Sequence, residues 1–206
     1  MNTRTRRTQQ TRDERRDEIR RTLLRSIEEL VRQGHSLADI TVERMATHAG
    51  MSRANFYVYF QDRADVLRAW FDTVTEELLN TTSAWWAMGP ESPRAELRTV
   101  LGRAAAAYRP HVTLLSAVHD TGLYDPEMRA QLDAFLERQS DDLAQHIRDG
   151  QQKGFIPLRL PARETAVWLA RMAERMQRTI LANASDDELD RHLDTYVDIV
   201  WFTLYA

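Results

Sequence analysis

The chain has 206 residues and a formal net charge of −3 at pH 7, with 43% hydrophobic and 29% charged residues. This length predicts one or two domains with a sizeable core, and the composition excludes disorder for most of the chain. The lack of cysteine excludes disulfides, thiol catalysis and cysteine-bound zinc. No apolar run approaches the roughly 20 residues of a membrane span. No apolar signal segment follows the first arginines, so we expect a cytoplasmic protein without membrane contact.

Charge is unevenly distributed between the head of the chain and its body. Residues 1–68 carry 14 Arg and 10 acidic residues, a net of +4, whereas residues 69–206 carry a net of −7. A basic head on an acidic body favours a polyanionic partner for the head, although a solvated helix face gives the same asymmetry. Residues 1–12 hold four arginines and no acid, so we expect a disordered basic arm there.

The next elements are all predicted as helices. A capping box at Thr11 starts a helix of about twenty residues, with apolar positions at helical spacing, that ends before Gly34. Two short helices follow, over 42–48 and 52–60, with Gly50 between them. Asp62 caps a longer helix that we expect to run towards Trp85 and Trp86.

The remainder of the chain is also predicted to be helical. Helices are expected after Ser92, from Pro110, from Pro126, from Pro161 and after Ser185. No segment alternates with period two for long enough to propose a strand. The expected fold is therefore all-α with about nine helices. We divide it into the arm, a smaller helical domain over 13–60 and a larger helical domain over 61–206.

Residues 41–67 have the pattern of a helix-turn-helix, because two short helices flank Gly50. The outer face of the second helix is expected to show Arg53, Asn55, Tyr57 and Tyr59. Arginine can bond guanine edges, asparagine can bond adenine edges, and tyrosine hydroxyls reach phosphates. Thr41 and Ser52 stand at helix N-termini, which attract phosphate. The alternative is two ordinary core helices with a short connection.

This segment resembles the DNA-binding domain of the TetR family of bacterial regulators. The matching residues are Thr41, Met45, Ala46, Ala49, Gly50, Met51, Ser52, Phe56, Tyr57, Phe60, Asp62, Arg63 and Leu67. Arg63 stands where the family usually has lysine and keeps the charge of a phosphate contact. Ala64 replaces the usual acid, so a charge partner in the first turn of that helix is lost.

Several shorter sequence segments resemble the ethionamide-resistance repressor subgroup of the family. Among these segments are Leu37–Ile40, Tyr57–Phe60 and Leu160–Arg163. The resemblance implies a homodimer, and a dimer with two recognition helices reads a pseudo-palindromic operator. The last two helices are apolar around more than one face, which favours a second partner. The interface is expected to contain Tyr196, Val200 and Trp201; burial within one chain is the alternative.

The family also implies a ligand pocket inside the helical body, and its apolar character favours a lipophilic effector. Gln139 is the candidate polar anchor of this pocket. The bulky candidates for its lining are Trp85, Trp86, Leu97, Leu101, Tyr108, Phe135, Leu136, Trp168, Met172 and Met176. The alternative is that these residues form a closed core. The six histidines show no metal-ligand spacing and no catalytic motif is present, so we expect neither a cofactor nor a reaction.

These observations predict a sequence-specific DNA-binding regulator, a repressor that a small lipophilic ligand releases from its operator. A transcriptional activator of the same fold is the alternative, as is a helical-bundle carrier or enzyme from another functional class. The residues expected to contact DNA are Thr41, Ser52, Arg53, Asn55, Tyr57, Tyr59 and Arg63, with Arg4, Arg6 and Arg7 of the arm.

Overall fold

The computed structural model describes the backbone of residues 3–37 and 39–206, and the side chains of 14–37 and 39–206. Over this range every regular element is a helix, with ten α-helices and one 3-10 helix. The all-α prediction is therefore confirmed. The tenth α-helix arises because α4 (Arg63–Asn80) ends early, and α5 (Ser83–Trp86) forms a separate turn. No helix within the described range is long and apolar enough to cross a bilayer.

The chain divides into two compact units, Met1–Asp72 and Thr73–Ala206. The division falls inside α4, whereas the sequence suggested a boundary between residues 60 and 61. We call these parts the first and the second unit.

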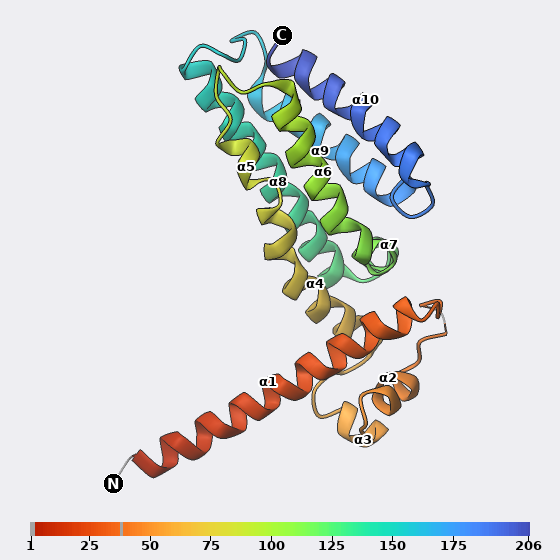
Figure 1. The fold of residues 1–206 in the computed structure, drawn as a ribbon. Coiled ribbons are helices and arrows are strands. Elements are labelled where there is room, and N and C mark those ends of the chain that lie inside the picture. Colours follow the sequence, from red (N-terminus) through yellow and green to blue (C-terminus); the bar gives the residue numbers. More distant parts are fainter. Residues whose placement is uncertain (1–2, 38) are drawn as a thin grey trace. The chain divides into compact units, whose positions relative to one another are not determined.

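The first unit contains α1 (Thr3–Arg32), α2 (Val42–His48), α3 (Arg53–Phe56) and the start of α4 (Figure 1). The helix α1 begins at Thr3 instead of near Thr11, so the expected disordered arm is helical from residue 3. Neither glycine nor proline interrupts this stretch, and arginine and glutamine are good helix formers. The side chains of Arg4, Arg6 and Arg7 lie outside the described ones.

The core of the first unit forms where α1, α2 and α3 meet the first turns of α4. The fully buried side chains include Leu23, Ile27, Ile40, Met45, Phe56, Phe60, Val66 and Trp70. The indole nitrogen of Trp70 donates to the carboxylate of Glu28 at 2.7 Å, so the largest side chain in this core keeps its polar atom satisfied. This bond connects α1 to α4 within the first unit.

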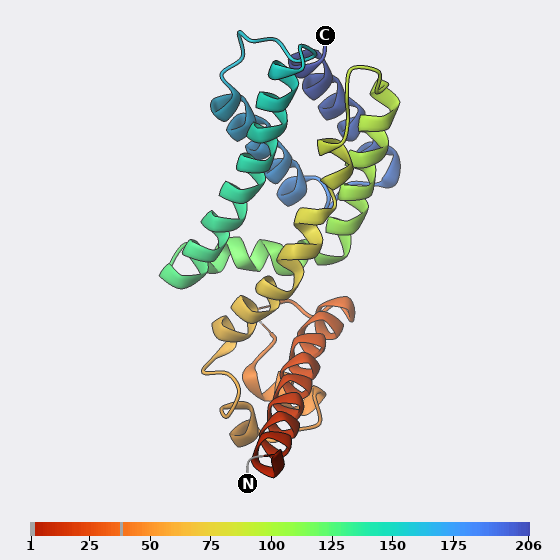
Figure 2. The same ribbon diagram turned by 90° about the vertical axis from the view of Figure 1, so that its left-hand side faces the viewer.

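The second unit is a helical bundle, shown from two directions in Figures 1 and 2. After α5 it contains α6 (Arg94–Tyr108), the 3-10 helix η1 (Arg109–His111), α7 (Val112–Thr121), α8 (Pro126–Gln152), α9 (Ala162–Thr179) and α10 (Asp186–Leu204). The most extensive packing joins α8 to α9 and α6 to α10. Burial of the apolar sides of these helices produces one continuous core.

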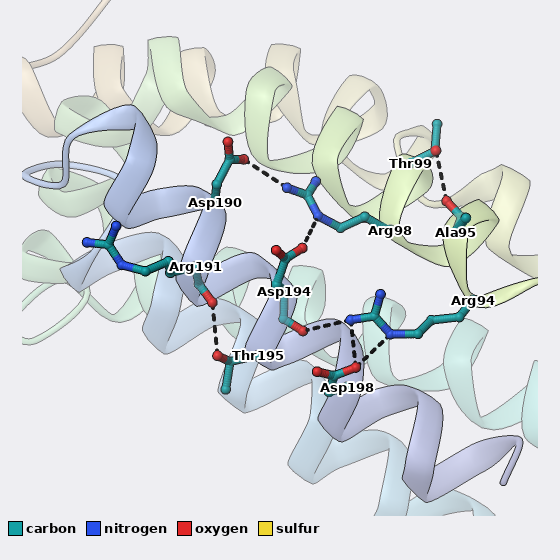
Figure 3. A network of polar contacts seen from close by, with 9 residues as sticks. All are labelled: Arg94, Ala95, Arg98, Thr99, Asp190, Arg191, Asp194, Thr195 and Asp198. Carbon is teal, nitrogen blue, oxygen red and sulfur yellow. Dashed lines mark hydrogen bonds and ion pairs between the residues drawn. The ribbon is translucent and has the colours of Figure 1, made fainter.

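Ion pairs fix the register between α6 and α10 (Figure 3). Arg94 Nε donates to Asp198 at 2.6 Å, and Arg98 donates to Asp194 at 2.5 Å and to Asp190 at 2.8 Å. A Cβ atom at Gly102 would lie 2.9 Å from the Arg98 guanidinium, so glycine leaves room for that side chain. The carboxylates are about half exposed or more, so these pairs contribute more to alignment than to stability.

Candidate nucleic-acid interface and internal cavity

The two short helices of the first unit begin at hydroxyl caps. Thr41 Oγ1 accepts a hydrogen bond from the backbone N–H of Arg44, and Ser52 Oγ accepts one from that of Asn55, both at 3.2 Å. Each cap satisfies a backbone donor that the first turn of a helix leaves unpaired. Because both caps are exposed, the N-termini of α2 and α3 face solvent, where they are accessible to a phosphate.

The turn between α2 and α3 depends on Gly50. Its φ of +71° lies in the left-handed region, which glycine adopts at no steric cost. The N–H of Met51 returns to the carbonyl of Ala46 at 2.9 Å, which closes the end of α2. Ala46 is buried and small, so the helices pack closely at this point. The geometry is that of the predicted helix-turn-helix.

The outer face of α3 presents polar side chains to solvent. Arg53, Asn55 and Tyr57 are exposed, while Phe56 on the opposite side is fully buried. The helix ends at Phe56, so Tyr59 lies in the following turn and not on the helix as predicted. Its side chain is half-buried, and its carbonyl accepts a 3.4 Å hydrogen bond from Arg20.

The side chain of Arg63, which is predicted to contact phosphate, makes a hydrogen bond within the first unit. Its guanidinium donates to the carbonyl of Leu37 at 2.5 Å, which connects the start of α4 to the loop before α2. The side chain is exposed. A guanidinium has five N–H donors, so this bond leaves donors for an anion.

A cavity of about 60 Å³ lies inside the second unit. Its walls come from α5, α6, α8, α9 and α10 and are mainly apolar. Six of the residues predicted to line a pocket do line it, namely Trp85, Trp86, Leu101, Tyr108, Gln139 and Met176. The other lining residues are Thr82, Ala104, Ala105, Leu143, Ala170, Ala173, Gln177, Leu193 and Tyr196.

Three polar side chains form a cluster in the wall of this cavity. Gln139 Nε2 donates to the hydroxyl oxygen of Tyr108 at 2.7 Å, and Gln177 also hydrogen-bonds to that hydroxyl. Burial raises the pKa of Tyr108 well above its ordinary value, so the phenol stays neutral. Sequence reasoning missed Gln177, although it lies four residues after Ala173, at the spacing of one helix face.

Five of the predicted lining residues lie elsewhere. Leu97, Phe135 and Leu136 are buried but do not reach the cavity. Trp168 is 72% exposed and Met172 is 37% exposed, so placing them in the cavity wall was wrong. The buried face of α9 instead carries two small residues and one leucine, namely Ala166, Leu169 and Ala170. The bulky Trp168 and Met172 occupy a second apolar face.

Two of the three residues predicted for a dimer interface, Tyr196 and Val200, are turned inward and do not form an outer face. Val200 is fully buried, and the hydroxyl of buried Tyr196 donates to the carbonyl of Leu169 at 2.8 Å. Trp201 is half-buried. The outward apolar residues of α10 are Ile199 and Phe202, which sequence periodicity alone did not distinguish from the inner ones.

Comparison with known proteins agrees with this architecture. The family model described as "Transcriptional regulator EthR, C-terminal domain" matches residues 97–206. The HTH-type transcriptional regulator EthR of Mycobacterium tuberculosis (strain ATCC 25618 / H37Rv) is 27% identical over 192 residues, covering 91% of this chain and 87% of that protein.

Solved structures share the fold at lower identity. A transcriptional regulator from Saccharomonospora viridis, in complex with choline, has a TM-score of 0.73 at 18% identity and covers 92% of this chain and 99% of its own. Thermus thermophilus FadR, a TetR family repressor in complex with lauroyl-CoA, has a TM-score of 0.63 at 19% identity, covering 91% of this chain and 95% of its own. Because the matching family model spans more than half of the chain, the protein belongs to the EthR family of TetR-type transcriptional regulators.

Proposed function

We propose that this DNA-binding regulator is a homodimeric repressor that leaves a pseudo-palindromic operator when a small lipophilic molecule binds its second unit. The observation that carries the proposal is the exposed polar face of α3, in a unit with a helix-turn-helix geometry. The internal cavity in the other unit supports the ligand-dependent part. The protein acts on DNA, so we place it in the cytoplasm.

Direct readout is assigned to two residues of α3. Arg53 suits the O6 and N7 atoms of guanine, and Asn55 suits the N6 and N7 atoms of adenine. The remaining residues are assigned to phosphates, which position the protein without specifying a sequence; these are Thr41, Ser52, Tyr57, Tyr59, Arg63, Arg4, Arg6 and Arg7.

The homodimer is assigned to the outer apolar faces of the last two helices. Trp168 and Met172 lie four residues apart on α9, and Ile199 and Phe202 lie three apart on α10, so each pair shares one helix face. All four side chains are exposed in the single chain, with Phe202 at 66%. Exposed apolar residues of this size at helical spacing are typical of an interface.

The effector is assigned to the cavity beside the cluster of Tyr108, Gln139 and Gln177. Sites for small molecules usually have volumes of about 300–1,000 Å³, so a cavity of about 60 Å³ must widen when a ligand enters. Binding then shifts the protein towards the widened state, because a ligand favours the conformation that it binds better. Ligands in two structures of this fold, choline and lauroyl-CoA, support small-molecule binding in such a body.

The DNA part is tested by selecting genomic fragments that the purified protein retains, followed by titration at several salt concentrations. We expect a bound sequence with two related half-sites and an affinity that falls steeply with salt. A reporter gene behind that sequence separates the two modes of regulation: loss of the regulator raises expression for a repressor and lowers it for an activator. The relatives are transcriptional regulators and not enzymes.

The effector part is tested by a screen of lipophilic compounds for a rise in melting temperature, since a ligand of the native state stabilises it. Ala173→Met places a longer side chain at the cavity wall and should abolish the shift, whereas Ala130→Met, at an exposed position of α8, should retain it. Compounds that bind must also weaken operator binding, because coupling between the two sites is reciprocal. A complete absence of such compounds contradicts the ligand-dependent part alone.

A further inference from the structure

A chain of hydrogen bonds crosses the end of the second unit, from α5 through the residue after α10 to α8. Trp85 Nε1 donates to the hydroxyl oxygen of Tyr205 at 2.8 Å. The same hydroxyl lies 2.7 Å from Nε2 of His146. A backbone hydrogen bond joins His146 to Trp86. The indole and imidazole are almost completely buried, with exposed fractions of 3% and 4%.

The direction of each bond follows from the donors available. The indole can only donate, so the Tyr205 oxygen accepts from it and uses its own proton towards His146 Nε2. The other ring nitrogen of His146 then carries the proton and donates to the Trp86 carbonyl. This arrangement requires a neutral imidazole, which burial favours. The Tyr205 hydroxyl therefore serves as donor and acceptor at once.

Residues of this chain of bonds line two spaces. One is the internal cavity, whose wall includes Trp85 and Trp86. The other is a second pocket of about 280 Å³, which we define by its lining residues Met88, Gly89, Pro90, Ser92, Phe155, Trp201 and Tyr205. Neither space alone reaches the usual volume of a small-molecule site, but both together do.

Tyr205 has the least enclosed side chain in this chain of bonds. It lies after the last residue of α10 and is half-buried, whereas Trp85 is held inside the core. Its ring contacts Phe155, at 6.3 Å between centroids, His146, at 6.1 Å, and Trp201, at 5.1 Å. If the ring swings outward, a buried N–H donor on Trp85 and a buried acceptor on His146 lose their shared partner. Unpaired buried groups of this kind are costly.

We propose that the Tyr205 position is an effector subsite for a hydroxyl group, and that the effector is an apolar alcohol or phenol which replaces the Tyr205 hydroxyl between Trp85 and His146. The ligand oxygen accepts from the indole and donates to the imidazole, so both buried groups stay satisfied. An ether or ketone of the same shape can accept from Trp85 but leaves His146 Nε2 without a donor. This inference rests on the proposed effector function and specifies the chemistry of its ligand.

Three small matched probes test the subsite on the full-length protein by isothermal titration calorimetry: 4-ethylphenol, 4-ethylanisole and 4-ethyltoluene. We expect 4-ethylphenol to bind at least about tenfold more tightly than either analogue, because only its hydroxyl pairs both buried groups. Equal affinities for the phenol and the anisole, or no binding of the phenol, overturn the proposal.

Two variants locate the hydroxyl contact. Tyr205→Phe removes the competing hydroxyl and should tighten 4-ethylphenol binding several-fold, because the Trp85 and His146 groups are then unpaired before binding. Trp85→Phe removes the donor and should reduce the preference for the phenol. A variant that is merely less stable shows neither the tighter binding of 4-ethylphenol nor the reduced preference for it. A loss of stability is therefore distinguishable from the loss of a hydroxyl contact.

Ala130→Met, at an exposed position of α8, is the matched control and should not change the preference for the phenol. Gln139→Leu removes the polar anchor of the internal cavity and shows whether the hydroxyl binds there instead. If the preference is lost in Gln139→Leu and unchanged in Tyr205→Phe, the hydroxyl binds at the inner anchor and the subsite is wrong. On the same protein, we also measure operator binding and the release of the operator by other compounds. The proposal of a ligand-released regulator therefore stands or falls separately from the hydroxyl subsite.

Discussion

In α3, the guanidinium of Arg53 donates a hydrogen bond to the hydroxyl oxygen of Tyr57 at 3.3 Å, and its Cζ atom lies 5.8 Å from the centre of the Tyr57 ring. Tyr57 is the C-cap of α3, four residues after Arg53, and both side chains are exposed on the same side of this helix end. The hydrogen bond with Tyr57 raises the pKa of Arg53, whose guanidinium is charged at neutral pH in any case. The contact places the guanidinium of the proposed base-reading arginine beside the Tyr57 ring.

We therefore predict different effects for substitutions of these two residues. Arg53→Ala should reduce the discrimination between the operator and a single-base variant by about 1–3 kcal/mol, as expected for loss of a bidentate contact. Tyr57→Phe removes a hydroxyl assigned to a phosphate, so it should weaken binding to the operator and to random DNA by similar factors. Fluorescence anisotropy with operator and variant duplexes measures both. Unchanged relative affinities in Arg53→Ala contradict its role as a base reader.

The phosphate role of Arg63 predicts a uniform loss of affinity. Arg63→Ala should weaken binding to all sequences alike and reduce the salt slope by about one unit. Arg138→Ala is the control, since this arginine pairs with Glu76 in the second unit. A slope that stays the same in Arg63→Ala means that the bond to Leu37 is its main role.

The proposed dimer interface predicts that Phe202→Arg yields monomers with an intact fold, since a charge opposed to an apolar partner surface is costly to bury. Val200→Ala is the contrasting variant. Its side chain is fully buried in its own unit, so it should lower the stability by about 1–3 kcal/mol and leave the dimer intact. Analytical ultracentrifugation at several concentrations distinguishes the two. A dimeric Phe202→Arg protein argues against this face.

The pKa of His146 predicts a loss of stability in mild acid. Burial lowers the pKa of His146 and outweighs the hydrogen bond with the Trp86 backbone and the charge of Asp149, which both raise it. The charge of Lys153 lowers it as well. The unfolded chain takes up its proton near pH 6.5, before the folded chain does, so this contribution is complete above that pH. It is lost as the pH falls towards the lowered pKa of the folded state, at no more than about 1.4 kcal/mol per pH unit.

Melting temperatures of wild type and His146→Gln between pH 7.5 and 5.5 check this expectation, and the decline should be shallower in the variant. His119 adds a decline of the same sign, because burial and Arg178 lower its pKa as well. His119→Gln therefore serves as the comparison. If the slopes of wild type and His146→Gln coincide, the imidazole is not held neutral by the fold.

The ion pairs between α6 and α10 predict a small effect that salt removes. Arg98→Ala should destabilise the protein by about 1 kcal/mol or less at low salt, because Asp190 and Asp194 are largely exposed. The difference from wild type should shrink in 1 M salt, where charges are screened over about 3 Å. A larger, salt-independent loss would indicate that the packing of the arginine stem around Gly102 matters more than its charge.

The sequence by itself determined the helical fold and the local motif of the first unit. Helical spacing and the caps at Thr41 and Ser52 are local signals, and so is the need for glycine at position 50. Such signals survive in the folded chain because they depend on residues only a few positions apart. Six members of the cavity lining were also predicted, since bulky residues in a helical body usually face inward.

Only the tertiary structure decided which apolar face of α9 and α10 points inward. Periodicity shows that these helices are apolar on two sides, but it does not say which side meets the core. Small residues such as Ala170 and Ala173 face the cavity, and Trp168 and Phe202 lie outside. The bond from Trp85 to Tyr205 joins residues 120 positions apart. Long-range contacts of this kind leave no local pattern in the sequence, because they arise only when the helices pack.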